Sequence, residues 1–229
     1  MFFHQLFEPE TSTYTYVIAD EETREAVIVD PVLEMIERDI AFLREHRLVA
    51  RYSLETHIHA DHVTGGGRLR ERLGLRTVVP AGAPADCADR FLGDREVLTV
   101  GSVAIRALHT PGHTPCHNAY LVADRVLTGD ALLIGGCGRT DFQGGDPGTL
   151  HDSITRRLFT LPDETRVFPG HDYRGLPEST IGREKRTNPR LAGKSRGEFV
   201  AIMKGLNLPR PKRIAVAVPA NRECGIVQG

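Results

Sequence analysis

The chain has 229 residues, of which 40% are hydrophobic and 26% are charged. This is the balance of a globular protein rather than a disordered one, and the length suffices for one substantial hydrophobic core. The 29 basic and 30 acidic side chains give a formal net charge of -1, so there is no electrostatic case for a nucleic-acid partner. A single domain over residues 1–229 is expected.

Local composition disfavours export and membrane insertion. The apolar start at residues 1–7 is short and is followed by Glu8 and Glu10, unlike a secretory signal, and no apolar run is long enough to cross a membrane. The four cysteines are far apart and form no CxxC pair: Cys87, Cys116, Cys137 and Cys224. Reduced thiols in a cytoplasmic protein are therefore expected.

Strand and helix patterns alternate along the first third of the chain. Strand-forming runs occupy residues 14–19 and 26–29, and apolar residues at helical spacing then predict a helix over 32–46. A strand at 49–54 runs into a histidine-rich loop at 56–64, after which three glycines lead into another short helix.

The remainder continues the alternation and favours a layered α/β fold. Five further strands are predicted, at 77–79, 97–100, 103–108, 119–122 and 126–127. A glycine-rich loop spans 135–145, and Asp146-Pro147 is typical of a helix start. After a short strand at 167–168, helical patterns occur near 178–187 and 195–206.

Residues that bind metals are concentrated in the histidine-rich loop. It contains three imidazoles and one carboxylate within six residues: His57, His59, Asp61 and His62. In an extended loop, alternate side chains point the same way, so the first two histidines can face one ion. Neutral imidazole binds zinc or iron, and a carboxylate compensates the charge of the ion.

Three more candidate ligands follow apolar strands and lie beside glycine: His113 in Pro111-Gly112-His113, Asp130 after Gly129, and His171 in Pro169-Gly170-His171. Glycine lets the backbone turn sharply and approach an ion closely. If all these strands end at the same edge of a sheet, the ligands gather there. The pattern predicts a metal site.

The ordered ligand set resembles that of the metallo-β-lactamase superfamily over nearly the whole chain. The resemblance implies an αββα sandwich, two mixed β-sheets flanked by helices, with the metal site at one edge of the sheets. In that superfamily the ligands form two sets bridged by Asp130: His57, His59 and His113 for one ion, and Asp61, His62 and His171 for the other. The ligands alone would imply a binuclear zinc hydrolase.

Three further segments resemble one branch of the superfamily, the persulfide dioxygenases related to the ethylmalonic encephalopathy protein. They are Gly136–Gln143, His171–Tyr173 with Arg186–Arg190, and Leu206–Pro209 with Val218–Asn221. Glyoxalase-II-like thioester hydrolases share the ligands but carry a larger helical C-terminal domain, and too few residues follow the last helical pattern for one here. The branch implies iron-dependent oxidation of glutathione persulfide by O2 to sulfite and glutathione, a step of sulfide oxidation.

The same resemblance implies one Fe(II) per chain, held by His57, His113 and Asp130 with open positions for oxygen and substrate. The remaining ligand-type residues would instead orient ligands and waters by hydrogen bonds: His59, Asp61, His62 and His171. Oxidation by O2 needs a redox-active metal, which zinc is not.

Glutathione carries carboxylates, and planar guanidinium groups bind carboxylates through paired hydrogen bonds. Arg139 in the glycine-rich loop is the first candidate for this contact, Tyr173 is the next, and Arg174 and Arg186 follow. Cys137 is expected to be packed rather than reactive.

Two alternatives stay open at this point. One is a glyoxalase-II-like thioester hydrolase with two zinc ions in the same ligands. The other is a non-catalytic binding protein on the same fold, which complete retention of the ligands disfavours because buried unpaired His and Asp side chains are costly. The oligomeric state also stays open, with a homodimer among the possibilities.

Overall fold

The computed structural model describes residues 1–226, which group by their contacts into two compact units. Unit 1 contains Met1–Leu92, Val97–Ile105 and the described part of Arg210–Gly229, and unit 2 contains Gly93–Glu96 and Arg106–Pro209. The expectation of one domain over the whole chain stays a prediction.

Unit 1 contains a mixed sheet in the strand order β1-β2-β3-β4-β5-β6. The strands are β1 (Phe2–Glu8), β2 (Thr13–Ala19), β3 (Glu25–Val29), β4 (Val49–Leu54), β5 (Arg76–Pro80) and β6 (Arg90–Leu92). The first three pair antiparallel, whereas β3/β4, β4/β5 and β5/β6 are parallel. Because parallel neighbours end at the same edge, the segments that follow β3 and β4 begin side by side.

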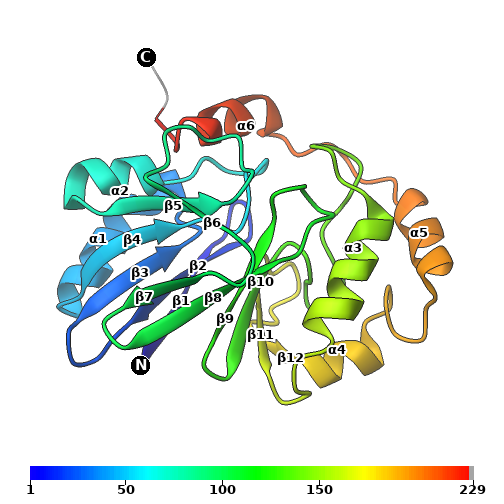
Figure 1. The fold of residues 1–229 in the computed structure, drawn as a ribbon. Helices are drawn as coiled ribbons and strands as arrows, with labels where there is room; N and C mark the ends of the chain where they lie inside the picture. The colour runs from blue at the N-terminus through cyan, green and yellow to red at the C-terminus, as the bar shows by residue number, and fades with distance from the viewer. Residues whose placement is uncertain (227–229) are drawn as a thin grey trace. The chain divides into compact units, whose positions relative to one another are not determined.

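Burial of apolar side chains explains these elements. Every residue of β2 is buried, and helices α1 (Ile36–Glu45) and α2 (Gly66–Leu73) lie beside the sheet (Figure 1). Ile40 and Leu43 of α1 and Leu69 of α2 pack with Ile28 of β3 in one core cluster. Each such side chain contributes about 1.5–3 kcal/mol through burial. A short 3-10 turn, η1 (Leu33–Met35), precedes α1.

The tail of unit 1 differs from what the sequence predicted. It contains a further helix, α6 (Ile214–Arg222), and Cys224 forms a disulfide with Cys87 across 137 residues of sequence. The expectation of four reduced thiols is therefore wrong for this pair. Cysteines so distant in sequence give no local spacing pattern, and only the fold brings them together. Cys116 and Cys137 are free and buried.

The second sheet has the strand order β12-β11-β10-β9-β8-β7. Its strands are β7 (Val97–Val100), β8 (Val103–His109), β9 (Asn118–Val122), β10 (Arg125–Gly129), β11 (Arg166–Pro169) and β12 (Ser179–Thr180). It is also mixed, because β10 and β11 are parallel whereas β8/β9, β9/β10 and β11/β12 are antiparallel.

The helices of unit 2 are α3 (Pro147–Ser153), continued by the π-helical turn η2 (Ile154–Leu158), then α4 (Ile181–Thr187) and α5 (Arg196–Lys204). The predicted start of α3 is confirmed: Asp146 is the N-cap, its side chain accepts the Thr149 N–H, and Pro147 follows. Leu150, Ile154 and Phe199 are fully buried in the core cluster of this unit.

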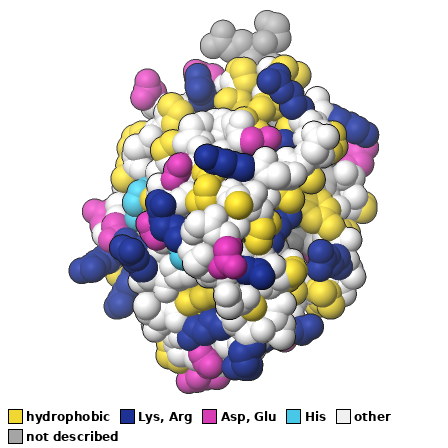
Figure 2. All heavy atoms as spheres, turned by 90° about the vertical axis from the view of Figure 1, so that its right-hand side faces the viewer, with side chains coloured by type: hydrophobic (Ala, Val, Ile, Leu, Met, Phe, Trp, Pro, Cys, Tyr) yellow, Lys and Arg dark blue, Asp and Glu magenta, His cyan; other side chains and the backbone are white. Residues whose placement is uncertain are grey.

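No helix among residues 1–226 is long and apolar enough to span a membrane. On the face drawn in Figure 2, Lys and Arg side chains lie interspersed with Asp and Glu side chains. This mixed distribution agrees with the formal net charge of -1.

Candidate metal centre

The predicted strand-to-ligand pattern is confirmed. The histidine loop follows β4 in unit 1, whereas in unit 2 His113 follows β8, Asp130 directly follows β10, and His171 comes two residues after β11. All these histidines are buried. Each unit therefore carries its own set of ligand-type side chains at the ends of strands.

The tautomer of His57 is fixed by two neighbours in unit 1. The Thr56 hydroxyl lies 2.8 Å from Asp30 Oδ2 and 2.9 Å from His57 Nδ1. The carboxylate can only accept, so the hydroxyl donates to Asp30 and is left to accept from His57 Nδ1–H. Asp30 also accepts the Thr56 backbone N–H at 2.7 Å. This arrangement leaves His57 Nε2 as the unprotonated nitrogen that can bind a metal.

The Nε2 edge of the His59 ring faces two buried carboxylates. Its Nε2 lies 3.1 Å from Asp30 Oδ1 and 3.3 Å from Glu55 Oε2. Burial alone lowers the pKa of the imidazole, but the two carboxylates outweigh burial and raise that pKa well above its usual value. His59 is thus engaged as a hydrogen-bond donor, and only its Nδ1 remains for another partner.

A second group of ligand-type atoms lies within unit 1: His59, Asp61 and His62. Asp61 Oδ2 lies 2.8 Å from His62 Nδ1 and also receives a long contact from the Thr13 hydroxyl at 3.4 Å. The Asp61 carboxylate therefore orients the His62 ring through Nδ1 and leaves His62 Nε2 available to a metal. This group is a candidate for a separate ion.

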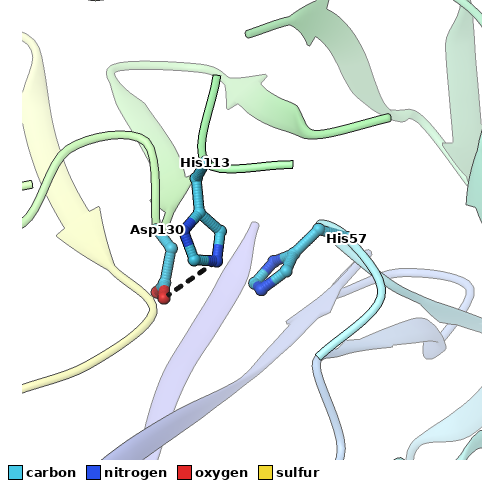
Figure 3. Close-up of side chains that lie close together, drawn as sticks. All are labelled: His57, His113 and Asp130. Carbon is cyan, nitrogen blue, oxygen red and sulfur yellow. Dashed lines mark ion pairs between the residues drawn. The ribbon is translucent and has the colours of Figure 1, made fainter. Parts of the chain in front are cut away.

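In unit 2, the ring of His113 is oriented by the glycine-rich loop. Its Nδ1 donates to the Arg139 carbonyl oxygen at 2.7 Å, so its Nε2 carries the lone pair. That Nε2 lies 3.5 Å from Asp130 Oδ2, as the dashed line in Figure 3 marks. His113 and Asp130 thus present a nitrogen and an oxygen toward each other at a spacing that a shared ion would bridge.

Asp130 is positioned by His117, a residue to which the sequence assigned no role. The Asp130 backbone N–H donates to His117 Nε2 at 3.1 Å, and His117 Nδ1 lies 2.9 Å from the Thr110 hydroxyl. His117 is fully buried. It follows His113 by four residues on the way into β9, but no sequence pattern separates such a supporting histidine from an ordinary core residue.

His171 lies beside the same carboxylate, with its Nε2 3.4 Å from Asp130 Oδ1. The ring of Tyr173 stacks on His171 with a centroid distance of 5.6 Å, while its own side chain is 68% exposed. Unit 2 therefore brings together three of the predicted ligand-type residues and one of the predicted substrate-binding residues.

The arginines predicted to bind substrate differ in what they contact. Arg139 forms a two-pronged pair with Asp141, both contacts at 2.7 Å, and also donates to the Leu208 and Pro209 carbonyl oxygens. Because its nitrogens are already used, this side chain clamps the loop to the segment that follows α5. A substrate carboxylate would have to replace one of these contacts.

Arg174 and Arg186 are both exposed. Arg174 follows Tyr173, its backbone N–H donates to Asp172 at 2.8 Å, and its guanidinium approaches Gly135 of the glycine-rich loop. Arg186 instead contacts Asp163 at 3.3 Å. Of these two, Arg174 is the guanidinium next to the glycine-rich loop.

Cys137 lies in the same loop and is buried against Met203, with its sulfur 3.6 Å from the Met203 sulfur. Burial raises the pKa of the Cys137 thiol, although nearby Arg190 opposes the shift. A raised pKa keeps the sulfur protonated and unreactive. The geometry agrees with the expectation of a packed cysteine.

The two sets of residues fit a bound metal ion. Within the described chain, each set contains a buried ligand-type atom with no hydrogen-bond partner: His62 Nε2 in unit 1 and Asp130 Oδ1 in unit 2. Leaving a buried polar atom unpaired costs about 1–3 kcal/mol, which metal coordination would offset. Imidazole nitrogens and carboxylate oxygens are ligands of zinc and iron.

The fold and this donor set define a metallo-β-lactamase-type metalloprotein. The model of the metallo-β-lactamase superfamily matches residues 9–171, and the predicted fold of two mixed sheets flanked by helices is confirmed. The mitochondrial persulfide dioxygenase ETHE1 of Mus musculus is 46% identical over 225 residues, covering 97% of this chain and 88% of the relative.

Solved structures also match this chain over most of its length. ETHE1 from Myxococcus xanthus matches with a TM-score of 0.97 and 54% identity, covering 99% of this chain and 100% of that chain. TTHA1623, solved in a di-iron-bound form, matches with a TM-score of 0.69 and 32% identity, covering 82% of this chain and 100% of that chain. The chain belongs to the persulfide dioxygenase branch of the metallo-β-lactamase superfamily.

Proposed function

We infer that this protein is an iron-dependent persulfide dioxygenase that oxidises glutathione persulfide with O2 to sulfite and glutathione. The observation that carries this function is its 46% identity, over 97% of the chain, to an enzyme named persulfide dioxygenase. The strand-end ligands His113 and Asp130, with His57 of unit 1, supply the donors that such an enzyme needs.

His57, His113 and Asp130 hold one Fe(II) per chain in this proposal; Figure 3 draws their side chains. Two imidazoles and one carboxylate are the donor set of non-haem iron oxygenases. When bound, ferrous iron supplies a redox-active centre for persulfide and O2 that zinc cannot supply. One ion held by three protein ligands leaves positions for both reactants.

The neighbouring residues of the chain prepare these three ligands. Asp30, acting through the Thr56 hydroxyl, keeps the proton of His57 on Nδ1. The Arg139 carbonyl does the same for His113. In both rings Nδ1 is the nitrogen that donates, so Nε2 is the nitrogen that faces the iron site.

The other ligand-type residues support this centre by hydrogen bonds rather than by binding iron: His59, Asp61, His62 and His171. The hydrogen bonds of His59 with Asp30 and of His62 with Asp61 support this assignment. His62→Ala should then retain iron with about 10- to 100-fold lower affinity, whereas His113→Ala should lose it. Equal loss in the two variants would remove the distinction.

A second candidate function rests on a specific observation. His59, Asp61 and His62 group together in unit 1, and the buried His62 Nε2 has no partner among the described residues. A second ion there would give a binuclear centre, such as a glyoxalase-II-like thioester hydrolase uses. TTHA1623, solved in a di-iron-bound form, is a structural relative with two metals.

The glutathione moiety binds, in this proposal, among Arg139, Tyr173, Arg174 and Arg186. The exposed Arg174, beside Tyr173 and the glycine-rich loop, can bind a carboxylate without breaking a described side-chain pair. Arg139 acts first as the clamp of that loop. A cytoplasmic location and a homodimer stay predictions, and the mouse relative is named mitochondrial.

The function is tested by supplying two substrates to protein reconstituted with iron without oxygen. With glutathione persulfide we expect O2 uptake and sulfite release in a ratio of one to one. With a glutathione thioester we expect no iron-dependent release of free thiol. Thioester hydrolysis without persulfide-dependent O2 uptake would instead establish the hydrolase.

A further inference from the structure

The C-terminal helix α6 reaches the histidine loop through one buried side chain. Asn221, 3% exposed, lies in the last turn of α6, and its carboxamide contacts three peptide groups of the loop. Its Nδ2 donates to the His59 and His62 carbonyl oxygens, both at 2.9 Å, and its Oδ1 accepts the Thr64 N–H at 2.8 Å.

A carboxamide is suited to this task because it carries two donor hydrogens and an acceptor oxygen on one planar group. Asn221 uses both kinds of atom on peptide groups that span the loop from His59 to Thr64. Backbone contacts hold the end of this loop: Val32 and Thr64 form an isolated β-bridge, and the Leu33 N–H donates to the Val63 carbonyl oxygen at 2.8 Å. The carboxamide of Asn221 connects this held end to the peptide groups of His59 and His62, which lie outside any helix or strand.

Asn221 itself is held on its C-terminal side. Cys224 forms the disulfide with Cys87, and the Cys224 carbonyl oxygen accepts the Gly67 N–H at 2.8 Å. A Cβ added at Gly225 would lie only 1.9 Å from the Thr64 carbonyl oxygen, so the two backbones are in close contact there. The position of the carboxamide is therefore set by the fold.

We propose that Asn221 is a positioning residue of the metal centre: it fixes the backbone between His59 and Thr64 and thereby the rings of His59 and His62. The proposal rests on the metal-binding role inferred above, because it assigns to Asn221 the orientation of groups that support the ion. Through this one side chain, α6 is hydrogen-bonded to three peptide groups that lie 157 to 162 residues earlier in the sequence.

Two substitutions separate positioning from general stability. Asn221→Ala removes all three contacts. Asn221→Asp keeps the shape and the oxygen that accepts the Thr64 N–H, but it sets a second oxygen against two carbonyl oxygens. We expect Fe(II) affinity, measured by anaerobic competition with a chromophoric chelator, to fall about 10- to 100-fold in both variants. The Asp variant should bind no more tightly than the Ala variant.

Ile40→Val is the matched control. Ile40 is buried in the α1 core of unit 1, and its core cluster contains no residue of the histidine loop. It should lower the melting temperature without changing Fe(II) affinity. If both Asn221 variants bind Fe(II) within twofold of wild type, or if Ile40→Val weakens binding as much as they do, the proposal is overturned.

A measurement on the wild-type protein decides the question should the variants not fold. Hydrogen exchange of the loop amides, Thr64 included, should slow when Fe(II) is added if the loop and the ion are coupled. Exchange that is unchanged by Fe(II) would contradict the positioning role. Failure of the proposed function has a different signature, namely wild-type protein that binds Fe(II) normally but takes up no O2 with persulfide.

Discussion

Gly138 is where the smallest change should do most harm to the metal centre. Its N–H donates to the Asp130 carbonyl oxygen at 2.7 Å, and a Cβ added there would lie 2.3 Å from that oxygen and 2.8 Å from His113 Nδ1. Real Cβ atoms do not approach so closely, so Gly138→Ala must displace the backbone at Asp130, the ring of His113, or both. These are two of the three proposed iron ligands.

Overpacking of this kind costs about 1–3 kcal/mol. If the clash is relieved by displacing the two ligands, Fe(II) affinity should fall about 5- to 150-fold, since 1.4 kcal/mol corresponds to a factor of ten. Anaerobic chelator competition measures the Fe(II) affinity, and thermal unfolding of the metal-free protein measures how far the substitution destabilises the fold itself.

Gly136→Ala provides the control, because an added Cβ there meets nothing nearer than Arg190 Cζ at 4.0 Å. It places the same methyl group in the same loop and should leave Fe(II) affinity unchanged. Wild-type affinity in Gly138→Ala would show that the loop yields without disturbing the ligands, and the reasoning from close approach would be refuted.

Three other predictions concern the clamp, the disulfide and a buried carboxyl group. Arg139→Lys should lower kcat/KM about tenfold on glutathione persulfide and equally on a small persulfide without carboxylates, because a lysine cannot keep the paired contact with Asp141; a loss confined to glutathione persulfide would assign Arg139 to carboxylate binding instead. Cys224→Ser should lower the free energy of unfolding in urea by about 2–4 kcal/mol. Reductant should lower it similarly in wild type only, and a wild-type curve indifferent to reductant would argue against the disulfide. Burial raises the pKa of Asp39 from 3.8 to about 6, against the opposing effect of Arg38. Because the folded state then holds the proton more tightly than the unfolded chain, the free energy of unfolding should fall as pH rises from 4 to 6, and Asp39→Asn should flatten that slope; an equal slope in both proteins would contradict the shift.

Local patterns were sufficient to predict a layered α/β fold, whereas its αββα arrangement was expected from the family resemblance. The candidate ligands were singled out because each follows an apolar strand and, in unit 2, a glycine, and the structure places them after strands as expected. The helix predicted over 32–46 occurs as η1 and α1, and the N-cap at Asp146 was found from the pair Asp146-Pro147.

The features that were missed depend on contacts distant in sequence. The edge strand β1 is only partly buried and was read as an apolar start. The helix α6 contains Pro219, which disfavours a helical prediction. Neither the Cys87–Cys224 disulfide nor the contacts of Asn221 have a local pattern, because their partners lie more than a hundred residues away. The clamp formed by Arg139 is likewise set by Leu208 and Pro209.

The central claim is that one ferrous ion, held by His57, His113 and Asp130, supports persulfide oxidation. The most direct test is the metal content of protein purified without oxygen, compared with its persulfide-dependent O2 uptake across preparations of different iron content. We predict about one iron per chain at full activity, with activity proportional to iron and no activity in protein loaded with zinc alone. Two metal ions per chain at full occupancy, or activity that follows zinc rather than iron, would contradict the account.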